Sequence, residues 1–240
     1  MNKTTTEQDN KALIEFWDKA LSLSEEETGD DHSNDPDEWK ELAPSEKLFE
    51  AACSLGRKKK VLDYGCGNAW AGIIVAKCGC PDVTAVDVAS GPVRTAEFYA
   101  GYFGVTGTLK AQCVATDWLE SVPDNSYDGF ICSNVIDVVP TETAEAIIRE
   151  SARIVTGDAT VIIGMNYYMS PETCADRGIE LAEGNKLYVD GVLRLVSRSD
   201  DEWKAIFAPY FTVERLEHFA WPGEQTEARR LFYLRKIKGN

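Results

Sequence analysis

Two glycines, Gly65 and Gly67, directly follow a short apolar run that ends in Asp63. Residues 61–62 predict a buried strand, and the apolar periodicity of residues 69–78 predicts the helix after it. Glycines in such a turn let the backbone adopt positive φ angles and let a ligand approach the main chain. The first N–H groups of the helix also lack partners within the helix. The turn is therefore a candidate ligand site, although glycines serve a purely structural purpose in many similar turns.

A second acid, Asp87, indicates which ligand this would be. It follows the next predicted strand, residues 83–86, and lies 20 residues after Gly67. In units of this kind that bind nucleotides, an acid at this distance accepts hydrogen bonds from the ribose hydroxyls. The pattern predicts a nucleoside and leaves two classes of enzyme: oxidoreductases that use a dinucleotide and methyltransferases that use S-adenosylmethionine.

Positions 69 and 70 distinguish these two classes. The dinucleotide fingerprint requires a small residue at position 70 for close packing of helix on strand, and this chain has Trp70 there. Residues 63–69, with the sequence DYGCGNA, instead resemble the first motif of the class I methyltransferases that use S-adenosylmethionine. Ala69 stands where many members of that family carry a third glycine.

The resemblance covers residues 57–166 with specific motifs and residues 198–238 in topology only. Residues 115–118 follow a strand predicted at 108–114 and are similar to the acid and apolar pair that flanks adenine in this family. Residues 126–140 resemble the fourth strand and the loop that borders the methyl donor. The next unit is matched by a helix at 141–154, a turn at 156–158 and a strand at 160–165.

The resemblance implies roles for individual residues in binding the cofactor S-adenosylmethionine. Asp117 would accept a hydrogen bond from the adenine amine, and Trp118 would cover the ring. The carbonyl of Asn134 would accept one from the amino group of the donor. The implied set is Asp63, Gly65 and Gly67 at the methionine part, Asp87 at the ribose, and Val88, Asp117, Trp118 and Asn134.

On the acceptor side, Asp137 is the candidate catalytic residue. It comes just after the fourth strand, where members of the family often place residues that handle the acceptor. We expect it to orient or deprotonate the substrate. Trp17, Tyr167 and Tyr168 are candidates for the walls of the substrate pocket.

The fold implied by the resemblance is α/β: a Rossmann-like three-layer αβα sandwich around a mostly parallel sheet of seven strands, in the order 3-2-1-4-5-7-6, with strand 7 antiparallel. Residues 1–56 would form a helical lid or cap segment, and residues 57–240 the methyltransferase domain. A helix at 203–207, opened by a capping box at Ser199, and strands at 211–219 and 229–237 would complete it.

Two segments are expected near the substrate. Residues 12–21 carry apolar side chains at helical spacing, which predicts either a lid over the donor pocket or a helix simply packed on the sheet. A second helix is expected at 38–55. The insertion at 166–197 contains Asp190-Gly191 between two strand-like runs, a strong hairpin signal. We expect this hairpin to help cover the substrate pocket; the alternative is that it extends the sheet or forms a dimer.

Composition limits the class of partner. The net charge of −15 makes nucleic acids and anionic membranes poor partners and favours a small-molecule substrate. The polar N-terminal residues and the lack of a long apolar run predict a cytoplasmic protein, a monomer or homodimer. The seven cysteines show no zinc spacing and are expected to be reduced thiols, with no metal site. His32 and His218 stand in no recognisable motif.

The predicted activity is transfer of a methyl group from S-adenosylmethionine to a small molecule by in-line displacement, with proximity supplying most of the rate enhancement. Two alternatives remain at this point. One is a protein of the same fold that binds the donor without turnover, and the other is a nucleotide-dependent oxidoreductase.

Overall fold

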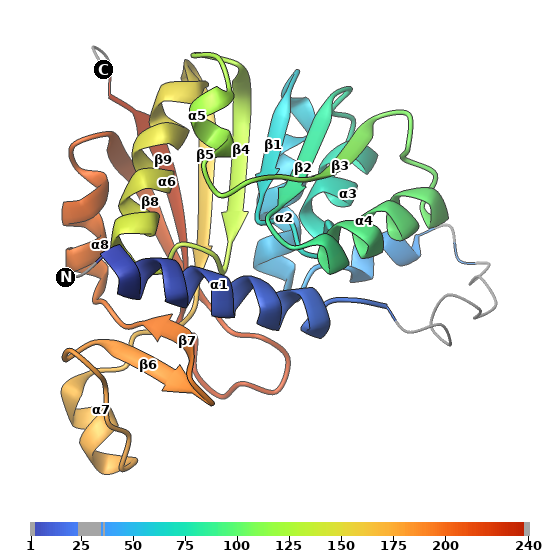
Figure 1. Ribbon diagram of the computed structural model, residues 1–240. Coiled ribbons are helices and arrows are strands. Elements are labelled where there is room, and N and C mark those ends of the chain that lie inside the picture. Colours follow the sequence, from blue (N-terminus) through green and yellow to red (C-terminus); the bar gives the residue numbers. More distant parts are fainter. Residues whose placement is uncertain (1–2, 24–34, 36, 238–240) are drawn as a thin grey trace.

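The computed structural model describes residues 3–23, 35 and 37–237. Its main sheet has seven strands in the order β3-β2-β1-β4-β5-β9-β8, with helices on both faces (Figure 1). The strands of this sheet are β1 (Val61–Tyr64), β2 (Val83–Asp87), β3 (Leu109–Cys113), β4 (Tyr127–Ser133), β5 (Val155–Met165), β8 (Phe211–Phe219) and β9 (Arg229–Lys236). β9 pairs antiparallel with both β5 and β8, and the other pairs are parallel. The predicted strand order is confirmed.

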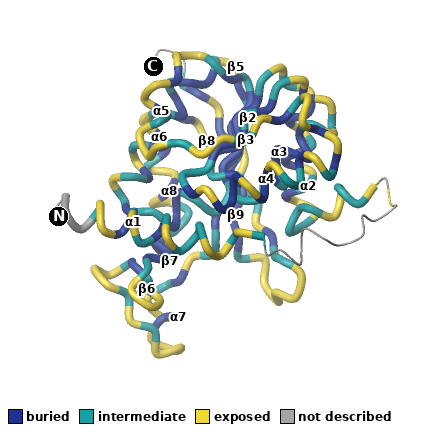
Figure 2. The backbone as a smooth tube through the Cα atoms, turned by 45° about the vertical axis from the view of Figure 1, so that its right-hand side comes forward, coloured by how far each residue is buried: buried dark blue, intermediate teal, exposed yellow. Residues whose placement is uncertain are grey.

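The helices divide between the two faces according to the core that they bury. The α-helices are α1 (Lys3–Ala20), α2 (Glu46–Ser54), α3 (Trp70–Lys77), α4 (Ser90–Tyr102), α5 (Trp118–Ser121), α6 (Thr141–Ile154), α7 (Pro171–Asp176) and α8 (Asp200–Phe207). One apolar core holds side chains of α5, α6 and α8, and the other holds side chains of α2, α3 and α4. β4 contributes to both, because alternate side chains of a strand point to opposite faces: Phe130 joins the first core and Ile131 the second. The buried backbone concentrates in the strands between these layers (Figure 2).

The central parallel strands end at one edge of the sheet. All residues of β1 are buried, as expected for a strand covered on both faces. β1 lies between β2 and β4, with Asp63 opposite Ala85 on one side and Ile131 on the other. The carboxyl ends of these strands therefore deliver the turns that follow them to a common edge.

Two sequence predictions about local structure are wrong. Residues 156–158 belong to β5, which begins at Val155 and takes up these residues in an irregularity of its pairing with β4. The single helix expected at 38–55 is divided into a 3₁₀ turn η2 (Glu38–Glu41), α2 and a 3₁₀ turn η3 (Leu55–Arg57). Pro44 explains the break, since it lacks an N–H group and disfavours helical backbone in the residue before it. Ser45 then caps α2 by accepting a hydrogen bond from the N–H of Leu48.

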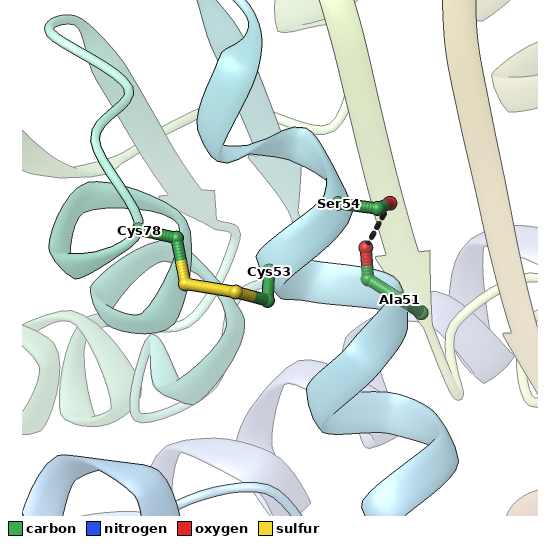
Figure 3. Close-up of a disulfide and its surroundings, with 4 residues drawn as sticks. All are labelled: Ala51, Cys53, Ser54 and Cys78. Carbon is green, nitrogen blue, oxygen red and sulfur yellow. Dashed lines mark hydrogen bonds between the residues drawn. A yellow bond between two sulfur atoms is a disulfide. The ribbon is translucent and has the colours of Figure 1, made fainter.

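A disulfide joins α2 to the end of α3. Cys53 and Cys78 lie 5.4 Å apart at Cα and are bonded through their sulfur atoms (Figure 3), so the expectation that every cysteine is a reduced thiol is wrong. Packing of α2 on α3 brings together two residues that are 25 positions apart. A cross-link over such a loop contributes about 3 kcal/mol in the chain-entropy account. Disulfides are uncommon in the reducing cytoplasm, so the cysteines give no support to a cytoplasmic location.

The predicted hairpin is confirmed and forms its own sheet. β6 (Lys186–Val189) pairs with β7 (Val192–Val196), apart from the main sheet. Asp190 and Gly191 have φ angles of 51° and 78°, as required at the centre of a tight hairpin turn of this kind. In Figure 1 the hairpin lies below α1, and no main-sheet strand is extended by it.

No helix in the described part of the chain combines the length and apolar character needed to cross a bilayer.

Candidate functional site

A cavity of about 380 Å³ lies at the edge where the parallel strands end. This volume falls within the range of small-molecule sites. Its described walls come from the sheet edge, α1, the start of α6 and two loops. The lining residues are Asn10, Leu13, Ile14, Trp17, Leu21, Leu42, Pro44, Tyr64, Gly65, Cys66, Gly67, Asn68, Trp70, Val86, Asp87, Val88, Val114, Thr116, Ser133, Asn134, Val135, Val138, Val139, Thr143, Ile147 and Trp221.

The glycine turn forms one end of this cavity. Gly65, Gly67 and Ala69 all have left-handed backbone, with φ angles of 66°, 55° and 59°. At Gly65 an added Cβ would overlap Val135 Cγ2, so both the backbone conformation and the space require glycine. Ala69 adopts the same conformation with a side chain, at the position before α3. The turn thus brings bare main chain to the cavity wall, as the sequence predicted.

Asp63 lies beneath this turn and does not line the cavity. Its carboxylate accepts a hydrogen bond from the N–H of Gly72 in α3 at 2.8 Å, and the residue is buried. Burial raises the pKa of the Asp63 carboxyl to about 7. Asp63 therefore fixes α3 against β1, and its contact with the methionine part of the donor stays a prediction.

Asp87 reaches the cavity at the end of β2. Its Oδ2 accepts from the N–H of Gly67 at 3.1 Å, and its Oδ1 accepts from the N–H of Ala89 at 3.0 Å. Burial raises the pKa of this carboxyl. Each carboxylate oxygen can accept a further hydrogen bond, so a pair of hydroxyl groups can bind here. Val88 lines the cavity beside it.

The turn after β3 reaches the cavity through residues other than those predicted. Val114 and Thr116 line it, whereas Asp117 is exposed and Trp118 packs partly buried against the core under α6. Thr116 belongs to the same matched motif, so the motif located the turn but not the side chain. The proposed adenine contacts of Asp117 and Trp118 stay predictions.

The loop after β4 supplies a further left-handed residue. Asn134 has a φ angle of 56°, lines the cavity and donates its N–H to the carbonyl of Gly164 at 2.8 Å. Left-handed backbone is uncommon outside glycine, and asparagine tolerates it better than most residues. The bond to Gly164 at the end of β5 fixes this loop at the cavity, in the place where the sequence expected it.

Asp137 is placed behind the cavity wall. It is fully buried, its Oδ2 accepts from the N–H of Asn166 at 2.7 Å, and it is absent from the lining residues. Burial raises the pKa of its carboxyl, while the Asn166 hydrogen bond and the Arg230 guanidinium lower it. Val138 and Val139, the next two residues, do line the cavity. Asp137 thus fixes the wall from behind, and its predicted role toward the acceptor stays a prediction.

Of the three predicted wall residues, only Trp17 lines the cavity. Tyr168 is 39% exposed, and Tyr167 packs against the cluster around Met169 in the insertion. The hairpin does not line the cavity either. It supports the helix that does, because Leu193 and Val196 of β7 pack with Leu13 of α1.

α1 crosses in front of the main sheet (Figure 1), and Asn10, Leu13, Ile14 and Trp17 of this helix line the cavity. Near its C-terminal end, Asp18 accepts from the N–H of Gly91 at 2.6 Å and from the Ser90 hydroxyl at 2.9 Å, both at the start of α4. The Thr95 hydroxyl donates to the carbonyl of Leu21 at 2.7 Å. An added Cβ at Gly91 would overlap the Asp18 carbonyl oxygen, so the close approach of α1 to α4 depends on glycine.

The other end of α1 is attached to α6 and to the hairpin. Asn10 Nδ2 donates to the Thr143 hydroxyl at 3.1 Å, and the Tyr188 hydroxyl donates to Asp9 at 3.0 Å. The Arg194 guanidinium lies 4.1 Å from the ring centre of Phe16. These contacts, which α6 and the hairpin make with α1, hold α1 over the cavity.

Sequence reasoning missed several lining residues, among them Leu42, Pro44 and Trp221. Trp221 lies in the loop between β8 and β9, and its ring stacks under the Arg229 guanidinium at 3.3 Å. Glu224 pairs with Arg229 at 2.7 Å and fixes the stack. No local pattern marks these residues, because each reaches the cavity only through tertiary packing.

The histidines are not part of the described site. His218 lies 3.0 Å from Asp200 on the surface and does not line the cavity, and His32 lies outside the described residues. Within the described ranges, no three His, Cys, Asp or Glu side chains are grouped as a metal would require.

Comparisons with known proteins agree with this geometry. Residues 61–158 match a family model described as a methyltransferase domain. A ubiquinone biosynthesis O-methyltransferase of Neisseria meningitidis serogroup C is 26% identical over 153 residues, which are 64% of this chain and 59% of the relative. A second such enzyme, from serogroup A, is 24% identical over 151 residues, 63% of this chain and 58% of the relative. The matches thus span about three fifths of the length of these relatives.

Solved structures share the whole fold at low identity. Magnesium protoporphyrin IX methyltransferase from Synechocystis PCC 6803, with bound SAH, superposes with a TM-score of 0.66 at 16% identity, covering 95% of this chain and 100% of that one. A protein from Pyrococcus horikoshii OT3 has a TM-score of 0.60 at 18% identity, covering 75% of this chain and 82% of that one.

Proposed function

We propose that this chain acts as a class I S-adenosylmethionine-dependent methyltransferase. It transfers a methyl group from S-adenosylmethionine to an oxygen atom of a small molecule. The observation that carries the proposal is the meeting of the glycine turn and Asp87 at one end of a largely apolar cavity. The names of the relatives from Neisseria, both O-methyltransferases, favour oxygen as the accepting atom.

The residues present fit the donor. The bare main chain at Gly65 and Gly67 would face its methionine part, with the Asn134 carbonyl at the amino group. Asp87 would bind the two ribose hydroxyls, and the apolar side chains of Val88 and Val114 would lie against the adenine. The donor supplies a methyl group that its sulfonium sulfur already activates.

The chain itself contributes position and enclosure. α1 lies over the cavity, so the acceptor is held in line with the methyl group and the leaving sulfur. The acceptor oxygen forms its bond to the methyl carbon as the carbon–sulfur bond breaks. Among the described lining residues the only ionisable side chains are Tyr64, Cys66 and Asp87, so the hydroxyl proton leaves to water. In this proposal Asp137 is a positioning residue that holds the loop after β4.

The lack of a base among those lining residues also favours a second candidate, a protein that binds the donor without turnover. The two are separated by incubating the protein with methyl-labelled donor and a cell extract and searching for a labelled product. Labelled product supports the enzyme, and donor binding without any product supports the second candidate.

Wider features of the proposal follow from charge and arrangement. Residues 1–56 act as a lid segment on the domain at 57–240. The substrate is a small molecule. Neither nucleic acid nor membrane is a partner, because the net charge of −15 repels the negative charge of nucleic acids and of anionic membrane surfaces. We also propose a cytoplasmic monomer or homodimer.

Isothermal titration with S-adenosylhomocysteine, the demethylated product, tests the donor site. Asp87→Ala removes two hydrogen bonds to a charged group, worth about 1.5 kcal/mol or more each, so binding weakens about 100-fold. Asp82→Ala is the matched control, because Asp82 is a half-exposed acid paired with Lys60 at 3.5 Å, and it leaves the affinity unchanged. If the wild-type protein binds neither S-adenosylmethionine nor S-adenosylhomocysteine, the proposal is wrong.

A further inference from the structure

The cavity has two distinct ends, which α1 connects. Near the C-terminal end of α1, Asp18 is bonded to Gly91, and Leu21 lies next to Gly67, where an added Cβ would be 3.5 Å from Leu21 Cδ1. In the other half of the helix, Asn10 is bonded to Thr143 of α6. Asn10 and Leu21 are separated by about 16 Å of helix, at about 1.5 Å per residue. The cavity therefore has space for the acceptor beyond the donor.

We call this second region the acceptor end and define it by Asn10, Leu13 and Ile14 of α1 together with Val139, Thr143 and Ile147. Leu13 and Val139 pack in one apolar cluster with residues of β7. None of these six side chains is ionisable. The nearby Arg194 lies against the rings of Phe16 and Trp17 and does not line the cavity.

An acceptor end of this composition selects against charge. A charged group that enters an apolar site loses its hydration, and no opposite charge among the described lining residues compensates for it there. The three ionisable lining residues at the strand edge do not alter this. Asp87 lies at the donor end, and burial raises the pKa of both Tyr64 and Cys66 and leaves them neutral. An uncharged molecule enters without this penalty.

One pair of polar groups interrupts the apolar surface. Asn10 Nδ2 donates to the Thr143 hydroxyl at 3.1 Å, and the Thr143 hydroxyl lies 3.4 Å from Asn10 Oδ1. Both residues line the cavity. An amide and a hydroxyl together retain capacity both to donate and to accept a hydrogen bond. They can therefore bind one uncharged polar group of the acceptor, such as a hydroxyl.

We propose, on the basis of the proposed function, that the acceptor is an uncharged, mainly apolar molecule, and that Asn10 and Thr143 bind a second hydroxyl at the end remote from the reacting oxygen. The juxtaposition of α1 and α6 creates this specificity. The donor end, built from the strand edge, takes no part in it.

Three probes with the same ring test the proposal: 2,6-dihydroxynaphthalene, 2-naphthol and 6-hydroxynaphthalene-2-sulfonate. They differ only in the remote substituent, which is a hydroxyl, a hydrogen or a sulfonate. Affinities are measured by fluorescence titration with and without saturating S-adenosylhomocysteine. We expect the diol to bind about 3- to 10-fold more tightly than 2-naphthol, because of one hydrogen bond. We expect the sulfonate to bind at least about 10-fold more weakly than 2-naphthol.

Two variants assign these preferences to the acceptor end. Thr143→Val removes the hydroxyl at constant shape, so the advantage of the diol disappears while 2-naphthol binds within about twofold of the wild-type value. Ile14→Lys places a cation in the wall and raises the affinity for the sulfonate about 10-fold relative to 2-naphthol. Glu15→Lys is the control, because Glu15 is an exposed neighbour on the same helix that pairs with Lys11, and it leaves the order of the probes unchanged.

Several outcomes would overturn the proposal: a sulfonate that binds as tightly as 2-naphthol, a diol with no advantage, a Thr143→Val variant that weakens both equally, or no binding of any probe. Since the order of the probes is also measured without S-adenosylhomocysteine, a failure to bind that compound refutes the donor proposal separately.

Discussion

The two ends of the cavity are built from different parts of the chain. At the donor end the contacts come from main chain held in unusual conformations, with Gly65, Gly67 and Asn134 all at positive φ. At the acceptor end they come from side chains of α1 and α6, which are bonded through Asn10 and Thr143 at a separation of 133 residues. The donor end is thus encoded within short segments, while the acceptor end depends on how distant helices pack. Substitutions at one end should leave the other intact.

The ends also differ in charge. The donor end has the half-buried Asp87 at its wall and the buried Asp63 beneath it, and both carboxyls have raised pKa values. Near the acceptor end, the buried acid Asp9 accepts from the Tyr188 hydroxyl and does not line the cavity. Asp137 stands behind the wall, where the Arg230 guanidinium opposes the effect of burial. The donor end should therefore respond to pH, and the acceptor end should respond to the polarity of its ligand.

The largest separation of the two ends is expected for Gly65→Ala. The added Cβ would overlap Val135 and the backbone would be held at positive φ, so the free energy of unfolding falls by about 2–4 kcal/mol. Affinity for S-adenosylhomocysteine falls more than about 100-fold, whereas 2-naphthol binds nearly as before. Calorimetric titration and urea unfolding measure both effects. Gly157→Ala is the control, since no atom lies within 4 Å of its added Cβ. Donor affinity within threefold of wild type would contradict the account of the turn.

A smaller effect is expected from Asp63→Asn, and it depends on pH. Burial raises the pKa of Asp63 from 3.8 to about 7, so the folded state prefers the protonated acid. This preference stabilises the fold fully below pH 3.8 and is lost as the pH rises through 7. Wild type should therefore lose about 2–3 kcal/mol relative to the variant between pH 5 and pH 8, at about 1.4 kcal/mol per pKa unit.

Urea unfolding at both pH values measures this difference. Asp82→Asn, which changes a half-exposed acid, should follow the wild-type pH dependence. Parallel pH dependences for wild type and Asp63→Asn would show that the carboxyl is not buried in its neutral form.

The attachment of α1 at the donor end is tested by Gly91→Ala. The new Cβ would overlap the Asp18 carbonyl oxygen and Ser22 Oγ, so α1 must move away from α4. We expect S-adenosylhomocysteine to dissociate about tenfold faster, equivalent to about 1.4 kcal/mol, in stopped-flow measurements. Gly101→Ala in the same helix has no atom within 4 Å and should leave the dissociation rate unchanged. Unchanged dissociation in both variants would mean that α1 does not hold the donor in place.

The smallest effect is expected from Ala69→Gly. Left-handed backbone costs an alanine about 1 kcal/mol, and the loss of one buried methyl group offsets most of this. The free energy of unfolding should rise by about 0.5 kcal/mol or less, with donor affinity within about twofold. Thermal unfolding and titration measure these quantities. A loss of more than 1 kcal/mol would show that the methyl contact matters more than the backbone strain.

The sequence by itself determined the elements and the donor end. The strand order followed from the resemblance to the class I methyltransferases that residues 63–69 and the later motifs carry. The hairpin at Asp190 and Gly191 and the turn between β1 and α3 followed from apolar periodicity and turn chemistry. The positions of Asp87 and Asn134 at the cavity followed in the same way. These features are local, because a residue's φ preference or its place at the end of a strand depends on its immediate neighbours.

Only the tertiary structure decided which side chains reach the cavity. It placed Asp137 behind the wall, Asp117 at the surface and Tyr167 and Tyr168 away from the site, and it brought Trp221 to the wall from the loop between β8 and β9. It also joined Cys53 to Cys78. The physical reason is that a motif fixes where the backbone goes, whereas the direction of a side chain and its distant neighbours depend on the packing of whole helices. The acceptor end consists entirely of such contacts.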